Sequence, residues 1–248
     1  SAADCSVQPC GTYLVTGGLG AIGLTVAEEL ASSAPSTVVL LGRTPAPPRE
    51  EWQRLIDDPA TDPGRRRSIE RLLALEEQGC TVEVFACDVA DAAALAGVVE
   101  EVHRRHGAIR GVFHCAGVAG GAMMAVRSDE DAAGVLAPRV HGTMALYRLL
   151  GDEVDFIALF SSLTAATGSF GQVDYCAANN VMDSFARWAT HHGRPVISIG
   201  WTQWTDSGMS ADRVDAAPQA FRRLQTGARY EDVDHPLLDR RLVAPGDA

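Results

Sequence analysis

The chain has 248 residues, of which 46% are hydrophobic, which is enough for one sizeable core but too little for two ordinary domains. Its formal net charge of -11 and its pI near 5.0 argue against a surface for nucleic acid or anionic membranes, because such surfaces are usually basic. No apolar run reaches the roughly 18 residues that span a bilayer, and residues 1–10 lack the pattern of a signal peptide. We therefore expect a cytoplasmic protein.

Short apolar runs alternate with helical patterns along the chain. Continuous rather than alternating hydrophobicity indicates strands that are covered on both faces, and strand–helix alternation indicates parallel crossovers. The sequence thus predicts an α/β fold: one Rossmann-like, doubly wound parallel sheet with helices on both faces. We expect strands at 12–16, 36–42, 81–89, 109–117, 156–162 and 195–201, and helices at 21–33, 65–79, 92–107, 130–150 and 169–193.

Two stretches fall outside this alternation. Residues 45–64 are rich in proline and acidic side chains and predict an excursion, followed by a solvated helix start at the arginines 65–67. After Met209 the pattern weakens, although residues 213–225 fit a final helix. The six cysteines include no CxxC pair and lie mostly inside apolar runs, so we expect buried free thiols rather than a disulfide framework or a metal site.

The segment TGGLGAIG, between the first strand and the first helix, has four closely spaced glycines. Glycine lets the backbone turn sharply and approach a pyrophosphate, whose charge is attracted by the N–H groups of the helix start. This context predicts dinucleotide binding; the alternative is a tight turn that only packs the helix on the strand. The residues expected to contact the cofactor here are Thr16, Gly17, Gly18, Gly20, Ile22 and Gly23.

The choice of dinucleotide depends on the end of the second strand. A carboxylate there binds the ribose 2′-hydroxyl of NAD, whereas a cation accepts the 2′-phosphate of NADP. This chain has LLGRT, so Arg43 supplies the cation and predicts NADPH. After the third strand, Asp88 is placed to bond the adenine, with Val89 beside it; capping the next helix is the competing role for Asp88.

The stretch SFGQVDYCAANN, residues 169–180, places a tyrosine and two asparagines inside an alanine-rich helical segment. Asparagine is a poor helix-interior residue, so this pattern needs a reason. Tyr175 and Asn179 are four residues apart and share one helix face. Asn180 lies on a different face, and we expect no functional role for it.

The chain resembles the ketoreductase domain of polyketide synthases, within the short-chain dehydrogenase/reductase superfamily. The resemblance rests on the order and spacing of TGGLGAIG, LLGRT, CDVAD, HCAGV, LFSS, YCAAN and WTQW followed by GM. The resemblance runs from about residue 11 to about residue 209. It implies NADPH-dependent reduction of the β-keto group of an intermediate tethered by phosphopantetheine to an acyl carrier protein. It also implies neighbouring synthase domains as partners, and cofactor contacts from Ala116 and Gly117.

The resemblance also assigns catalytic residues. Ser162 at the end of the fifth strand, Tyr175 and Asn179 match the family's serine, tyrosine and asparagine, and Ser161 would be a structural neighbour. Hydride addition to a ketone leaves an alkoxide, which needs a proton and hydrogen bonds. Tyr175 would supply the proton, Ser162 a second hydrogen bond, and Asn179 a relay water or the helix geometry. His114 is then expected to be a packed strand residue rather than a base.

The family's lysine belongs in a stretch resembling LAPRVHGT, where this chain has Arg139. At about 4 Å and an effective dielectric of 20, a cation stabilises a phenolate by about 4 kcal/mol, so arginine meets the electrostatic demand. Arginine does not readily release a proton, however. We expect Arg139 to orient the ribose while water reprotonates Tyr175. The alternative is a reductase-like scaffold that binds NADPH but turns over poorly or not at all; a free-standing dehydrogenase is disfavoured because such enzymes have lysine at the position of Asn179.

Two family signatures for product stereochemistry are absent. Residues 119–121 are Ala-Gly-Gly instead of an LDD-like triplet, and Thr167 stands where a tryptophan would precede the tyrosine by eight residues. The configuration of the alcohol is therefore left open. Trp201, Trp204 and Met209 fall where the family's substrate lid begins, with core packing as the alternative role for the tryptophans.

The resemblance divides the chain into three parts. We expect a linker over residues 1–10, the ketoreductase catalytic domain over 11–227, and a tail or the start of a dehydratase-like module over 228–248. The motif HPLLDRRL suggests the dehydratase, and His235 would then belong to it. Reductase before dehydratase is the order of iterative synthases of the enediyne type.

Overall fold

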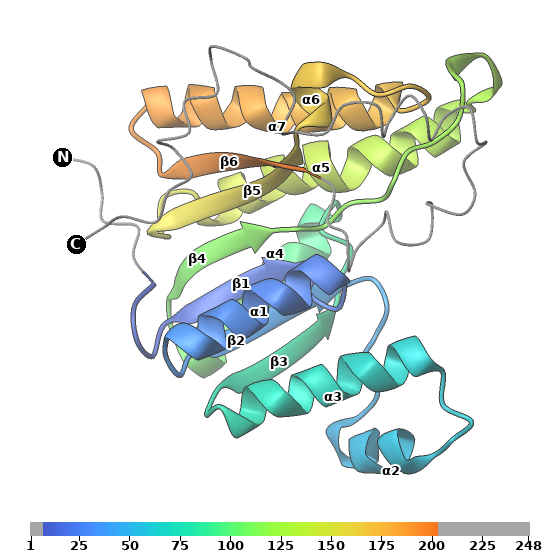
Figure 1. The fold of residues 1–248 in the computed structure, drawn as a ribbon. Coiled ribbons are helices and arrows are strands. Elements are labelled where there is room, and N and C mark those ends of the chain that lie inside the picture. The colour runs from blue at the N-terminus through green and yellow to red at the C-terminus, as the bar shows by residue number, and fades with distance from the viewer. Residues whose placement is uncertain (1–6, 203–248) are drawn as a thin grey trace, which may run out of the picture. The chain divides into compact units, whose positions relative to one another are not determined.

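The computed structural model describes residues 7–202. The chain divides into a unit ending at Gly208 and a unit beginning at Met209, and all described residues belong to the first. Its six strands form one parallel sheet in the order β3-β2-β1-β4-β5-β6 (Figure 1). The strands are β1 (Thr12–Thr16), β2 (Thr37–Gly42), β3 (Thr81–Ala86), β4 (Ile109–His114), β5 (Phe156–Ser162) and β6 (Val196–Trp201).

Helices connect the strands and cover both faces of the sheet. The main helices are α1 (Ala21–Ser33), α3 (Pro63–Glu77), α4 (Ala92–His106), α5 (Asp129–Leu150) and α7 (Val173–His191). The short ones are η1 (Arg49–Glu51), α2 (Trp52–Asp57), η2 (Met124–Val126) and α6 (Thr164–Thr167). The predicted Rossmann-like α/β fold is therefore confirmed, with one strand for each predicted strand.

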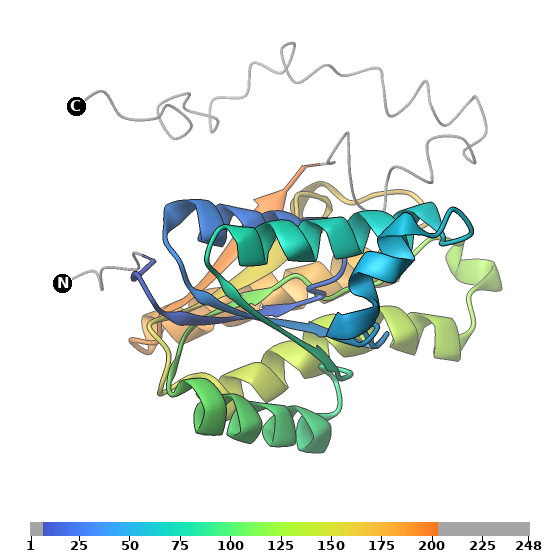
Figure 2. The ribbon, with the colours of Figure 1, turned by 90° about the horizontal axis from the view of Figure 1, so that it is seen from below.

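The continuous apolar runs form strands because alternate side chains enter two separate cores. Leu14 packs in the core under α4, α5 and α7, whereas Tyr13 and Val15 pack in the core under α1 and α3. Figure 2 shows α1 and α3 on one side of the sheet and α4 and α5 on the other. Both faces of β1 are thus buried, which is why its sequence shows no polar alternation.

The predicted excursion at residues 45–64 contains more structure than expected. Trp52 begins α2, is buried, and donates a hydrogen bond from its indole Nε1 to the carbonyl of Pro47 (2.8 Å). Helix α3 begins before the three arginines, because Asp62 caps it by accepting from the N–H of Arg65 (2.9 Å) and Pro63 occupies the first turn.

Over residues 7–202, no helix combines the length and apolar character needed to cross a membrane. The five cysteines in this range are free thiols, but only Cys80 and Cys87 are buried as predicted, because Cys10 is exposed and Cys115 and Cys176 are partly buried; Cys5 lies outside the range. Trp204, Met209, His235 and the helix expected at 213–225 also lie outside the described residues.

Candidate active site

The predicted site residues come from loops and helix starts at one edge of the sheet. Because all six strands are parallel, the segments that follow β1, β2, β4 and β5 emerge at their shared carboxyl edge. The strand order reverses at β1, which pairs with β2 on one side and β4 on the other. Doubly wound sheets bind ligands in the crevice at this point.

The glycine turn after β1 is built from close backbone contacts. Gly17 has a φ of +66°, and a Cβ on Gly23 would lie 2.3 Å from the carbonyl oxygen of Gly17. A Cβ on Gly18 would lie 2.6 Å from the Cβ of Leu40. Gly20, the N-cap of α1, brings no side chain to the helix start. The first N–H groups of α1 are thus not capped by a side chain, and this turn fits a dinucleotide pyrophosphate.

The residues predicted to select and hold the adenosine end are accessible. Arg43 follows β2, is exposed, and forms no ion pair within the described residues, so its guanidinium is available for a 2′-phosphate. Asp88 is also exposed. The capping alternative for Asp88 is wrong, because Asp91 caps α4 by accepting from the N–H groups of Ala93 and Ala94. The carboxylate of Asp88 instead accepts from Ala90 N (2.9 Å).

Two residues predicted to contact the cofactor have buried side chains. The Thr16 hydroxyl lies 2.6 Å from His114 Nδ1 and accepts from the N–H of Ala116 (3.2 Å). The buried side chain of Val89 packs against Gly142 of α5: a Cβ on Gly142 would lie 2.8 Å from Val89 Cγ1. The Thr16 side chain therefore supports the loop after β4, and the Val89 side chain packs against the middle of α5; neither lines an open surface.

His114 is a packed strand residue, as expected. It is completely buried at the end of β4. Burial, followed by the positive charge of Arg139, lowers the pKa of the imidazole to about 4, and the main chain of Pro138 opposes this. His114 is therefore neutral at physiological pH, and Thr16 has one hydroxyl proton to give to its Nδ1.

Arg139 and Tyr175 lie in contact. The guanidinium carbon of Arg139, on α5, is 4.4 Å from the centre of the Tyr175 ring, on α7. Arg139 is 3% exposed, whereas Tyr175 is half-buried. Burial lowers the pKa of Arg139 from its ordinary value, while Tyr175 and the carboxylate of Asp174 oppose this. Helices α5 and α7 thus place a cation over the face of the Tyr175 ring.

The loop after β4 lies against the same guanidinium. Arg139 Nη1 donates to the carbonyl of Val118 (2.9 Å), and a Cβ on Gly117 would lie 2.3 Å from Nη2. Only glycine leaves room here. Gly117 and Ala116 therefore shape the floor beneath Arg139 and also adjoin the glycine turn, because a Cβ on Gly17 would lie 2.9 Å from Ala116 N.

Ser162 ends β5 with a hydroxyl that acts as an acceptor. Thr164 donates to Ser162 Oγ from its own hydroxyl (2.9 Å) and from its N–H (3.3 Å). Since both contacts use lone pairs, the proton of Ser162 is left to donate elsewhere. Ser161 is buried and donates to the carbonyl of Asn179 (3.4 Å), which is the structural role predicted for it.

The two asparagines of α7 have different roles. Asn179 is completely buried and donates from Nδ2 to the carbonyl of Tyr175 (2.8 Å), one turn earlier. Its Oδ1 is buried without a hydrogen-bond partner among the described residues, which leaves an acceptor for a bound water. Asn180 is exposed and donates to the carbonyl of Ala165 (3.2 Å), so it joins α7 to α6.

Sequence reasoning missed three residues of this region. Thr164 positions Ser162, and the carboxylate of Asp174 forms an ion pair with Arg127 beside Tyr175. Thr164 could have been found from the sequence, because a threonine two residues after a serine is close enough to form a local hydrogen bond with its side chain. Arg127 and Asp174 are far apart in sequence, and no local pattern connects them.

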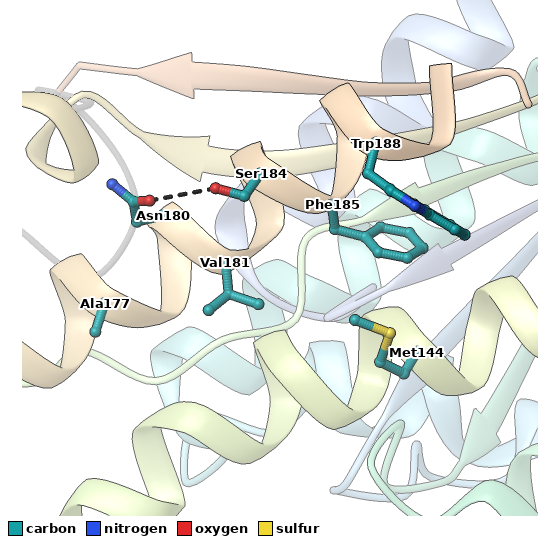
Figure 3. A pocket seen from close by; sticks show the side chains of 7 residues that line it. All are labelled: Met144, Ala177, Asn180, Val181, Ser184, Phe185 and Trp188. Carbon is teal, nitrogen blue, oxygen red and sulfur yellow. Dashed lines mark hydrogen bonds between the residues drawn. The ribbon is translucent and has the colours of Figure 1, made fainter. Parts of the chain in front are cut away.

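An apolar groove of about 590 Å³ lies elsewhere, on the outer side of α5 and α7. Figure 3 shows Met144 of α5 across from Phe185 and Trp188 of α7. Asn180 and Ser184 provide polar groups at one end and are joined by a hydrogen bond (3.4 Å). None of the predicted site residues lines this groove.

The arrangement of a glycine turn, a serine, a tyrosine and a buried cation agrees with a match to the family described as "KR domain", which covers residues 11–206. The chain belongs to the ketoreductase domain family of polyketide synthases. This ketoreductase is part of the short-chain dehydrogenase/reductase superfamily, as the sequence motifs implied. The match leaves the predicted domain end at residue 227 untested.

The relatives of this ketoreductase are much longer proteins. It is 36% identical over 208 residues to 5-methyl-1-naphthoate synthase of Streptomyces sahachiroi, covering 83% of this chain and 11% of that protein. It is 35% identical over 257 residues to 6-methylsalicylic acid synthase of Aspergillus terreus, covering 97% of this chain and 14% of that protein. The chain thus spans about a seventh or less of these two synthases.

Solved ketoreductases share the fold. An A1-type ketoreductase superimposes with a TM-score of 0.72 at 31% identity, over 88% of this chain and 42% of that one. An N-terminal ketoreductase from the macrolactin assembly line gives 0.71 at 32% identity, over 84% of this chain and 39% of that one.

Proposed function

We propose that this domain reduces the β-keto group of a polyketide intermediate to a β-hydroxyl, with NADPH as the reductant. The intermediate would be a thioester carried by the phosphopantetheine of an acyl carrier protein, within a cytoplasmic synthase. The observation that carries the proposal is the contact between Arg139 and Tyr175, 4.4 Å from guanidinium carbon to ring centre, at the sheet edge that also bears the glycine turn.

The residues of the turn and of the second strand's end would hold the cofactor. The uncapped start of α1 binds the pyrophosphate, and the free guanidinium of Arg43 binds the 2′-phosphate that distinguishes NADPH from NADH. The exposed carboxylate of Asp88 is available to the adenine. When bound, the nicotinamide supplies a hydride to the ketone carbon.

Tyr175 and Ser162 would act on the carbonyl oxygen. The phenol donates its proton as negative charge develops, and the hydroxyl proton of Ser162, left unused by its contacts with Thr164, provides the second hydrogen bond. Arg139 stabilises the phenolate that remains, because its charge is buried beside the ring. A water at the free Oδ1 of Asn179 would return a proton to Tyr175.

The test is oxidation of NADPH at 340 nm with a surrogate ketone, trans-1-decalone. We expect turnover by the unaltered protein and a loss of at least about 100-fold in Tyr175→Phe, which removes the acid and keeps the ring. Tyr147→Phe is the matched control, because Tyr147 lies on α5 among Phe185 and Trp188, outside the site. Equal rates in Tyr175→Phe and the unaltered protein would reject this mechanism.

A second candidate function follows from the identity of Arg139. The guanidinium is bound to the carbonyl of Val118 and does not readily release a proton, which favours a cofactor-binding scaffold with poor turnover. The two functions differ in turnover. A scaffold would bind NADPH, seen as quenching of its tryptophan fluorescence, but would oxidise no NADPH when the ketone is added, whereas a reductase would oxidise it. The proposed reductase also includes the start of a dehydratase-like module after residue 227. This places reductase before dehydratase, the order of enediyne-type synthases.

A further inference from the structure

A buried ion pair lies directly beside Tyr175. Arg127 Nη2 and Asp174 Oδ2 are 2.6 Å apart, and their side chains are only 14% and 5% exposed. Arg127 precedes Ser128, the N-cap of α5, and Asp174 is in the first turn of α7. The pair therefore joins the starts of the two helices that supply Arg139 and Tyr175.

The segment of residues 118–127 contacts the start of α7 at Gly120 and Ala122 as well as through Arg127. A Cβ on Gly120 would lie 2.5 Å from Asp174 Oδ1 and 3.2 Å from the Cβ of Tyr175. The N–H of Ala122 donates to the carbonyl of Gly171 (3.0 Å), just before α7. The main chain of this segment is thus a wall of the site next to the phenol.

The ion pair between Arg127 and Asp174 interacts electrostatically with Arg139. Asp174 is the carboxylate that opposes the effect of burial on the pKa of Arg139. Arg127 forms its ion pair with Asp174 and also donates from Nη2 to the main-chain carbonyl of Asp131 (3.3 Å), while its Nε is buried without a hydrogen-bond partner among the described residues. Neutralising Asp174 would therefore remove the ion-pair partner of Arg127 and a compensating charge for the buried Arg139.

We propose that Arg127 and Asp174 are positioning residues for ketone reduction: their ion pair fixes segment 118–127 against α7 and thereby sets how the substrate carbonyl meets Tyr175. This inference rests on the proposed reduction for its kinetic consequences, but not for its structural ones. It predicts that the pair acts on substrate binding and on the product's handedness more than on cofactor binding, because Arg127 and Asp174 lie at the starts of α5 and α7, whereas the glycine turn follows β1.

The experiment compares Asp174→Asn, Arg127→Leu and the double variant with the unaltered protein. Asparagine keeps an oxygen that can accept from Tyr175 N, as Asp174 Oδ1 does (2.8 Å), so this variant removes mainly the charge. The double variant leaves no unpaired charge at position 127 and so limits simple loss of folding compared with Asp174→Asn alone. Glu28→Gln is the matched control, because Glu28 pairs with Arg71 at 2.5 Å between α1 and α3.

The first readout is deuterium exchange of the backbone amides of residues 118–127, which needs no activity. We expect exchange in this segment to quicken at least about tenfold in all three variants, or about 1.4 kcal/mol of opening free energy, and to be unchanged in Glu28→Gln. Arg127→Lys should restore most of the protection. Unchanged exchange, or an equal effect of Glu28→Gln, would overturn the proposal.

The second readout is kinetic, with trans-1-decalone and chiral analysis of the alcohol. We expect KM for the ketone to rise about tenfold and the ratio of alcohol enantiomers to shift, while NADPH binding by fluorescence stays within about twofold. An unchanged KM and unchanged ratio in an active enzyme would refute a positioning role. If the unaltered protein reduces no ketone, the proposed function fails, and the exchange experiment still decides whether the pair fixes the segment.

Discussion

Arg139 and Tyr175 meet through the face of the aromatic ring, with 4.4 Å between the guanidinium carbon and the ring centre. Since they come from α5 and α7, the contact depends on the packing of two helices and not on either sequence alone. Cations at this distance from an aromatic face are attracted to it, and more strongly when they are buried.

We predict that Arg139→Lys keeps or raises turnover and that Arg139→Gln lowers kcat by about 100-fold. Lysine retains the charge and can pass a proton, whereas glutamine keeps a donor for the Val118 carbonyl but loses the cation. The measurement is kcat at 340 nm, with thermal unfolding as the control for folding. A large loss in Arg139→Lys would contradict the assignment of Arg139 to the family's lysine position.

Gly117→Ala should reduce kcat strongly while the protein remains folded. The new Cβ would lie 2.3 Å from Arg139 Nη2 and would displace the guanidinium from Tyr175. The matched control is Gly97→Ala in α4, where the added methyl meets nothing within 4 Å. That control should raise the free energy of unfolding by about 0.5–1 kcal/mol and leave kcat unchanged. Equal activity of both variants would show that the position of Arg139 does not matter.

Arg43→Gln should change the preference between cofactors. We expect KM for NADPH to rise about tenfold, equivalent to about 1.4 kcal/mol, with little change for NADH, since only NADPH carries the 2′-phosphate. Arg187→Gln removes an exposed charge from α7 and serves as the control. A parallel loss with both cofactors would mean that Arg43 does not recognise the 2′-phosphate.

His114 should make the protein less stable in acid. Its folded-state pKa, about 4, lies below the unfolded value of 6.5, so the unfolded chain binds more protons between these two pH values. The contribution of neutral His114 to the free energy of unfolding is complete above pH 6.5 and is lost as the pH falls to about 4. The loss amounts to about 3 kcal/mol. His114→Asn keeps an acceptor for Thr16 but cannot titrate. Urea unfolding from pH 7 to 4 should show a shallower decline for this variant; equal slopes would contradict the prediction.

The sheet and the cofactor turn could be predicted because their signals are local. Each buried strand is a run such as TVVLLG, and the glycines lie between such a run and a helical pattern. Tyr175 and Asn179 were recognisable for a similar reason, since four residues along one helix bring them to one face. Helix α2 was not predicted, because its start depends on the burial of Trp52, and the prolines around this residue favour an irregular loop.

Contacts between distant segments could not be predicted in this way. Thr16 meets His114 across 98 residues, and Arg127 meets Asp174 only because α5 and α7 pack side by side. The sequence therefore predicted a cofactor contact for Thr16 but gave no sign that its side chain also supports the loop after β4. Asp88 shows the same difficulty at short range, because Asp91 is an equally good cap and lies closer to the helix start.

The two segments that border Tyr175, residues 119–126 and 163–171, are joined to each other by a backbone hydrogen bond from the N–H of Ala122 to the carbonyl of Gly171. Backbone bonds of this kind tolerate many side chains. We therefore expect residues 119–126 and 163–171 to tolerate exchange between related domains only as a matched pair, because replacing one segment alone would leave the backbone group of the other without its partner.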